Sequence, residues 1–184
     1  MSLSVTRGDL LISAITLTDD NFTHTVVLLC EHSEEHGTYG LVLNRPVSTG
    51  QELLEEYPFL DGRLFQGGPV QKQVLQVLHP YGDTLSESHQ VLPGVWLGGD
   101  LDQLQSGFAS GLYDPDACRF FLGYSGWSRG QLASELELNA WVTVHGSADL
   151  VLHTKPRQIW ARAVRLSADD NPIYKHFPES PMWN

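Results

Sequence analysis

The sequence predicts one domain of the α+β class that spans residues 1–184. Its 184 residues, 41% of them apolar, suffice for one sizeable hydrophobic core. Strand-sized apolar runs dominate the chain, and helical periodicities interrupt them. Because strands and helices do not alternate strictly and no internal repeat is present, this order favours a mixed fold over a doubly wound parallel sheet.

Strand signals dominate the first third of the chain. The runs DLLISAIT (9–16) and HTVVLLCE (24–31) are apolar and rich in β-branched residues, and GLVLN (40–44) follows the second run after a glycine turn. We therefore expect the second and third runs to form a hairpin. Thr49, with Glu52 three residues later, predicts a capping box for a short helix that ends at the following Tyr-Pro pair.

The middle of the chain continues as strands until one clear helix. Strand-sized pieces lie at 63–70, 73–80 and 90–99, separated by Gly, Pro and Asp turns. Asp100 is expected to cap a helix that stops at Gly111.

The last third is predicted to contain a buried strand, a hairpin and a closing helix. CRFFLGY (118–124) has the continuous apolar character of a buried strand, and WVTVHG (141–146) with DLVLH (149–153) resembles a hairpin. Pro156 opens a helix whose apolar residues recur four apart on one face, namely Ile159, Trp160, Ala163 and Val164. The remainder, about 167–184, contains three prolines and no periodicity, and we expect it to be irregular.

Charge restricts the classes of partner. The chain has 22 acidic and 11 basic residues, so its formal charge of −11 repels the phosphate backbone of nucleic acids and disfavours direct binding to them. A local cluster of positive charge keeps a weaker DNA-binding hypothesis open, and it comprises Lys155, Arg157, Arg162 and Arg165.

The sequence indicates a soluble, cytoplasmic protein. No signal-peptide pattern opens the chain, and no apolar run approaches the roughly 18 residues that a membrane helix requires. Cys30 and Cys118 each lie in an apolar run, where a free thiol packs as a small hydrophobic group.

Ser128 raises the question of catalysis. It stands in the G-x-S-x-G pattern of residues 126–130, between a predicted strand and a predicted helix, as a hydrolase nucleophile does. The nearest candidates for the acid and histidine that should follow, Asp149 and His153, lie four apart on what resembles one strand and do not converge on the serine. We therefore favour a capping box in which the Ser128 hydroxyl accepts the amide of Gln131 and the glutamine side chain bonds back. The nucleophile remains the alternative.

The helix after Ser128 carries a polar row beside its apolar face. Gln131, Glu135 and Asn139 recur at four-residue intervals, next to the arc that contains Leu132 and Leu136. This row is interpreted either as a solvent-exposed surface or as the wall of a polar pocket.

Other motifs predict no metal or cofactor. HSEEH (32–36) matches a zinc-protease pattern, but it falls between a strand and a glycine turn, where the histidines lose helical spacing. Glu31 and His32 close a strand and can point into the molecule. The glycine pairs in GGPV and LGGD lack the lysine of a phosphate loop and indicate turns or close backbone contacts. Trp127, Trp141 and Trp160 are expected in the core or at its rim.

Taken together, the motifs resemble the AlgH/YqgE family of bacterial proteins. The segments TVVLLCEH, GLVLNRP, GGPV, VLH, GYSGWSRGQLASELELNAW and RQIWARAV occur in the family's order, from about Gly8 to Val164. The resemblance implies a mostly antiparallel, bifurcated sheet curled into a pseudo-barrel and flanked by helices. It implies no accepted reaction, although some members are labelled as transcriptional regulators. The polar positions that carry the motifs are Glu31, His32, Asn44, Arg45, Gln131, Glu135 and Asn139.

Three hypotheses of different classes follow. The first is a non-enzymatic regulatory protein that recognises a small polar ligand or a protein partner, with Arg45, His32, Gln131 and Glu135 at its site. The second is a serine hydrolase that uses Ser128. The third is a DNA-binding regulator that acts through residues 155–165.

Overall fold

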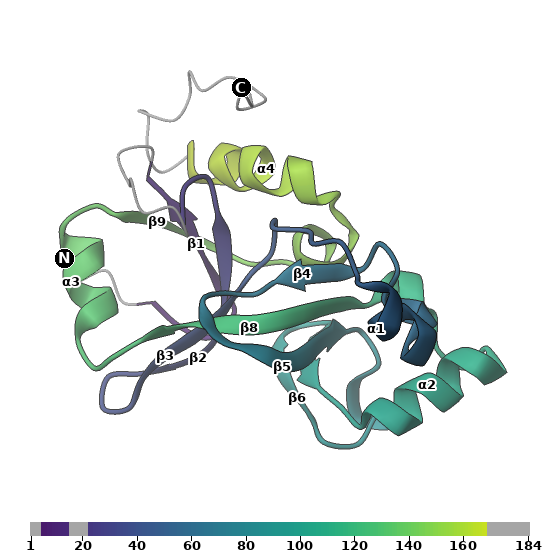
Figure 1. Ribbon diagram of the computed structural model, residues 1–184. Coiled ribbons are helices and arrows are strands. Elements are labelled where there is room, and N and C mark those ends of the chain that lie inside the picture. The colour runs from purple at the N-terminus through teal and green to yellow at the C-terminus, as the bar shows by residue number, and fades with distance from the viewer. Residues whose placement is uncertain (1–4, 15–21, 169–184) are drawn as a thin grey trace.

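The computed structural model describes residues 5–14 and 22–168 of the chain (Figure 1). Its strands are β1 (Asp9–Ser13), β2 (Val26–Ser33), β3 (Gly37–Val42), β4 (Leu64–Gln66), β5 (Val70–His79), β6 (Ser88–Leu92), β7 (Val95–Gly98), β8 (Arg119–Trp127) and β9 (Trp141–His145). Its α-helices are α1 (Gln51–Glu56), α2 (Leu101–Ser110), α3 (Gln131–Glu137) and α4 (Pro156–Ala168). Short 3-10 turns lie at Pro58–Leu60, Gly82–Thr84 and Pro115–Ala117, and a π-helical turn, η4, at Asp149–His153.

The strands form one curled sheet in the order β6-β7-β5-β8-β3-β2-β1-β9, with β4 beside β8. All neighbours are antiparallel except β4 and β8, which pair in parallel from Leu64↔Phe120 to Gln66↔Leu122. Strand β8 is the branch point, because it pairs with β4 in its first half, with β3 near its end, and with β5 as well. The expected α+β fold with a curled, mostly antiparallel sheet is confirmed.

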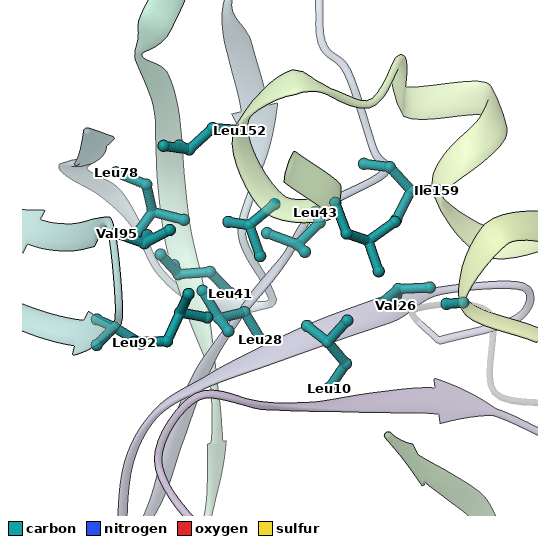
Figure 2. Close-up of a cluster of buried hydrophobic side chains, with 14 of the residues drawn as sticks. Leu10, Val26, Leu28, Leu41, Leu43, Leu78, Leu92, Val95, Leu152 and Ile159 are labelled. Carbon is teal, nitrogen blue, oxygen red and sulfur yellow. The ribbon is translucent and has the colours of Figure 1, made fainter. Parts of the chain in front are cut away.

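The main core fills the inside of this half-barrel. Val91 and Leu92 of β6, at one end of the sheet order, share a buried cluster with Leu10 of β1, near the other end. Figure 2 shows Leu10, Leu28 and Leu92 below Leu152 and Ile159, which come from η4 and α4. The apolar face predicted for α4 is confirmed, since Ile159, Trp160, Ala163 and Val164 are all buried.

Helices cover the outer face of the sheet in two separate places. Helix α3 packs Leu132 and Leu136 against a cluster that includes Val27, Leu29 and Trp127. Helix α2 packs Leu104 against the cluster around Phe120. Strands buried on both faces need no alternation of apolar and polar residues, which explains the continuous run VVLLC in β2.

The chain crosses β8 between β4 and β5 on a pair of glycines. A Cβ atom at Gly67 would collide with the carbonyl of Gly123, and one at Gly68 would collide with the backbone of Tyr124 and Ser125. Gly123 itself has φ +69°, and a Cβ there would lie 2.7 Å from the carbonyl oxygen of Val70. The interpretation of GGPV as a close backbone contact is therefore confirmed.

A buried arginine joins β8 to the C-terminal part of the chain. Nε of Arg119 donates to the carbonyl of Leu152 at 3.3 Å, Nη1 to that of Leu43 at 3.4 Å, and Nη2 to that of Thr154. Burial lowers the pKa of the guanidinium to about 10.

Two local predictions are wrong. DLVLH is not a strand but the π-helical turn η4, in which Leu150, Val151 and Leu152 are all buried. Periodicity cannot separate a short, fully buried strand from a buried turn of helix. The capping box at Thr49 does not form, because Gly50 is the N-cap of α1 and the Thr49 hydroxyl donates to the carbonyl of Leu60 at 3.5 Å.

The caps of α2 are confirmed. The Asp100 side chain accepts the amide of Gln103 at 2.9 Å, and Gly111 ends the helix with φ 74°. Helix α4 runs through residues 167 and 168, where the irregular tail was expected to begin, and residues 169–184 lie outside the described residues.

Candidate functional site

An open groove of about 780 Å³ lies where β2 and β8 end and β3 begins. We call it the tyrosine groove, and it is lined by Arg7, Glu31, His32, Ser33, His36, Gly37, Thr38, Tyr39, Val70, Tyr124, Gly126, Trp127 and Ser128. In Figure 1 the β2–β3 hairpin projects from the rest of the sheet, and its residues line one side of the tyrosine groove. Its volume falls in the range of small-molecule sites, which often occupy the mouths of β-barrels.

Two tyrosines form the base of the groove. The rings of Tyr39 and Tyr124 lie 4.9 Å apart between centroids, tilted by 41°, and both pack against the interior core cluster. Burial raises the pKa of the Tyr39 phenol, with further contributions from Cys30, Glu31 and Tyr124. The Tyr39 hydroxyl is therefore neutral at physiological pH and can donate a hydrogen bond to a ligand.

Opposite charges stand at the rim. The carboxylate of Glu31 is 69% exposed, and its Oε1 lies 4.0 Å from Nε2 of His89, which belongs to β6. Arg7 is exposed and has no hydrogen bond or ion pair to the described part of the chain. The rim can therefore offer a cation and a carboxylate to a ligand at once.

His32 lies at one edge of the tyrosine groove and also lines the opposite side of the hairpin. Its Nδ1 lies 2.7 Å from the hydroxyl of Thr38, the residue paired with it across β2 and β3. On that side lies a second cavity of about 420 Å³, which we call the α3 pocket. Its apolar wall consists of Val5, Leu132, Ala133 and Leu136, and its polar groups include His32, Ser33, Glu34 and Ser128.

Ser128 makes half of the expected capping box. Its N–H donates to Oε1 of Gln131 at 3.0 Å, as expected, but its hydroxyl also donates to Oε1, at 3.2 Å. The hydroxyl does not accept the Gln131 amide, which donates to the Ser128 carbonyl instead, because the N-cap of α3 is Gly130, two residues after Ser128. Within the described residues, no histidine hydrogen-bonds to Ser128.

Glu135 connects α3 to the core. Its Oε2 accepts the indole N–H of Trp127 at 2.8 Å and that of Trp141 at 2.6 Å. Its Oε1 accepts from Nε2 of Gln131 at 3.0 Å. The carboxylate thus accepts hydrogen bonds from two buried tryptophans, and the expected placement of both rings in the core is confirmed.

Asn44 and Arg45 form hydrogen bonds with backbone groups near the start of β2. Asn44 accepts the amide of Val26 at 3.0 Å and donates to the carbonyl of His24 at 2.8 Å, and Nη2 of Arg45 donates to the carbonyl of Thr23 at 2.9 Å. Asn139 is exposed, with φ 55°, just after the end of α3. It suits this left-handed position better than most residues do.

The structure therefore divides the seven predicted site residues. Glu31 and His32 line the tyrosine groove, Asn44 and Arg45 hold the segment before β2, and Gln131, Glu135 and Asn139 belong to α3 and its end.

Sequence reasoning missed Tyr39, Tyr124, Arg7 and Gly126. The alternation in GTYG and GYSG was a usable signal for the tyrosines, but nothing local signalled that they come together.

The other motifs take local roles. The turn after β2 is held by Ser33, whose hydroxyl accepts the amides of Glu35 and His36 at 3.2 Å each, so HSEEH is not helical. Among residues 5–14 and 22–168, no three His, Cys, Asp or Glu side chains gather as a metal site. Arg162, from the basic segment, pairs with Asp149 at 2.7 Å. No helix in the described ranges is long and apolar enough to span a bilayer.

Comparison with known proteins decides the family. The sequence profile described as AlgH-like matches residues 10–171. The chain belongs to the AlgH-like family. A relative named UPF0301 protein from Chlorobium chlorochromatii is 39% identical over 98% of this chain and 96% of its own length. A second, from Cytophaga hutchinsonii, is 34% identical over 98% of this chain and 100% of its own length.

Two solved structures share the fold of this AlgH-like chain. The solution structure of AlgH from Pseudomonas aeruginosa superimposes with a TM-score of 0.70 at 30% identity, over 97% of each chain. The crystal structure of DIP2367 from Corynebacterium diphtheriae gives a TM-score of 0.73 at 20% identity, over 96% of this chain and 95% of that one, which concerns the fold alone.

Proposed function

We propose that this AlgH-like protein is a non-enzymatic binding protein that recognises a polar ligand or a protein partner in the tyrosine groove. The observation that carries the proposal is the tilted Tyr39–Tyr124 pair at the base of an open groove, with Arg7 and Glu31 at its rim. Aromatic rings supply rigid contact area, and the two charges can orient a ligand. Of the residues first selected from the sequence, Glu31 and His32 remain in this proposal.

The proposed role is regulatory. A link to transcription would run through a protein partner, because a formal charge of −11 opposes direct contact with DNA. We expect the protein to act in the cytoplasm, since Cys30 and Cys118 are both free thiols.

Binding is tested by titrating isotope-labelled protein with a library of small polar aromatic acids and amines. We expect saturable shifts of the backbone amides of Glu31, Tyr39, Tyr124 and Gly126, without chemical change in the added compound. In Tyr124→Leu the shifts weaken about tenfold, whereas Tyr57→Leu, at the end of α1 and outside the groove, leaves them unchanged. Shifts that are absent, or that survive Tyr124→Leu, contradict the proposal.

A direct assay separates binding from hydrolysis. The hydroxyl of Ser128 donates to an amide oxygen, and no described histidine bonds it, so the described residues supply no histidine base to activate this serine. We expect no covalent labelling by a fluorophosphonate. Labelling that disappears in Ser128→Ala, together with loss of ester cleavage, would establish the hydrolase instead.

A further inference from the structure

Strand β8 extends further than its neighbour β5. The last pair between them is Val70↔Tyr124, but β8 continues to Trp127. Its opposite edge is occupied there by β3, in the pairs from Gly40↔Ser125 to Thr38↔Trp127. In the described part of the chain, the end of β8 thus has a strand partner on one edge only.

The peptide groups of Gly126 point toward the open edge. The Trp127 carbonyl faces β3, because a Cβ atom at Gly37 would collide with it, and the Tyr124 carbonyl faces the opposite side, toward Gly68. Successive residues of an antiparallel ladder direct their N–H and C=O groups to alternate edges. Gly126, which is exposed and lines the tyrosine groove, therefore presents both groups to the groove.

We propose that the tyrosine groove takes an extended segment of a partner protein, which pairs with β8 at Gly126 in line with β5. This inference rests on the proposed function and names the class of its ligand. When a peptide adds as a strand to an open sheet edge, main-chain hydrogen bonds provide the affinity and alternate side chains provide the specificity. The groove, with a volume of about 780 Å³, can hold side chains of the bound segment as well as its backbone beside Gly126.

The groove also selects the side chains of that segment. One side chain lies over the Tyr39 and Tyr124 rings and is therefore apolar or aromatic. A neighbour on the same face, two residues away along the strand, carries a carboxylate for the Arg7 guanidinium, which is exposed and has no ion pair with the described part of the chain. The segment thus has an acidic and an apolar side chain on the same face, two residues apart.

The probe is the blocked peptide acetyl-Glu-Thr-Phe-Thr-Val-Thr-amide, followed through the amide signal of Gly126. Two derivatives carry an N-methyl group, one on the phenylalanine and one on the threonine that follows it. Because adjacent N–H groups of a paired strand point to opposite edges, we expect one derivative to lose at least about tenfold in affinity and the other to stay within about threefold. Equal affinities for the two derivatives overturn the inference.

A matched pair of protein variants tests the same contact from the other side. Gly126→Pro removes the outward N–H, a change that open strand edges tolerate, and we expect it to weaken peptide binding about tenfold. Gly126→Ala keeps the amide and adds a methyl group 3.4 Å from Cε2 of Tyr124, so Gly126→Pro should bind the peptide more weakly than Gly126→Ala, and equal affinities contradict the strand pairing. If Gly126→Pro does not fold, the two N-methyl peptides decide the question.

Failure of this inference differs from failure of the proposed function. If small aromatic acids shift the groove amides but the peptide at about 1 mM does not, strand pairing is wrong and the binding role stands. If neither probe binds, both proposals fall.

Discussion

The guanidinium of Arg119 lies over the ring of Phe65, with Cζ 5.3 Å from the ring centroid. The same group donates to carbonyls of Leu43, Leu152 and Thr154, which belong to two segments far apart in sequence. Neutral carbonyl oxygens and an aromatic face thus stabilise a buried positive charge.

Replacement of Arg119 by Met should destabilise the protein by about 2–4 kcal/mol, because buried carbonyls lose their donors. Arg119→Lys should recover only part of this loss, since one ammonium cannot reach three acceptors in a fork. Urea unfolding measures both changes. The exposed Arg129→Met is the control, expected within about 0.5 kcal/mol, and an equally small effect at Arg119 would contradict the structural role.

Glu135→Ala should cost about 2–4 kcal/mol, because two tryptophan N–H donors lose a charged acceptor. Glu135→Gln keeps one acceptor oxygen and should cost about half as much. Chemical unfolding followed by tryptophan fluorescence gives both values. Glu137→Ala, an exposed position on the same helix, should leave stability nearly unchanged, and a similar loss at both sites would refute this account.

His79 should make stability depend on pH. Burial lowers its pKa to about 4 from the usual value of 6.5, so the unfolded chain binds a proton at a pH where the folded protein does not. The contribution of His79 to stability is complete above about pH 6.5 and decreases as the pH falls toward 4, by at most about 3 kcal/mol.

The matched variant for that measurement is His79→Asn. The ring Nδ1 accepts the amide of Tyr81 at 3.1 Å, and an asparagine oxygen can take over this role without titrating. Unfolding free energies measured from pH 7 to pH 4 should decrease less steeply in the variant. Parallel curves for the two proteins would show that His79 does not titrate as expected.

Gly68→Ala should destabilise the protein by about 3 kcal/mol or more, or prevent folding, because the new methyl group meets the backbone of Tyr124 and Ser125. The control is Gly50→Ala, which has open space around the added atom and should cost less than about 1 kcal/mol. Thermal unfolding compares the two variants. An equally small loss of stability in Gly68→Ala would contradict the close backbone contact between Gly68 and β8.

The sequence was sufficient for features that are encoded locally. Asp100 and Gly111 delimit α2 through their own hydrogen-bonding and backbone preferences, and the four-residue spacing from Ile159 to Val164 fixes the buried face of α4. The strands of the first hairpin were also found, because β-branched residues and a glycine turn mark them.

Features that depend on tertiary contacts were beyond reach. The segment at 149–153 could not be recognised as a turn of helix until its three buried residues had neighbours. Asn44, Arg45 and Glu135 were chosen as polar groups suited to a ligand, yet they bond backbone and indole partners 6 to 22 residues away. The groove itself depends on Tyr39 and Tyr124, which are brought together only by the pairing of β3 with β8.

The position of β8 at the branch of the sheet also bears on how the chain folds. Residues 119–127 must pair with residues of β3, β4 and β5 that lie 41 or more positions earlier in sequence, the nearest being Leu78 opposite Arg119, before either half of the half-barrel can close. Loop closure over such separations is entropically costly and slows folding. We therefore expect slow, all-or-none refolding in which the pairing of β8 is the rate-limiting step. A chain truncated before residue 119 should not fold.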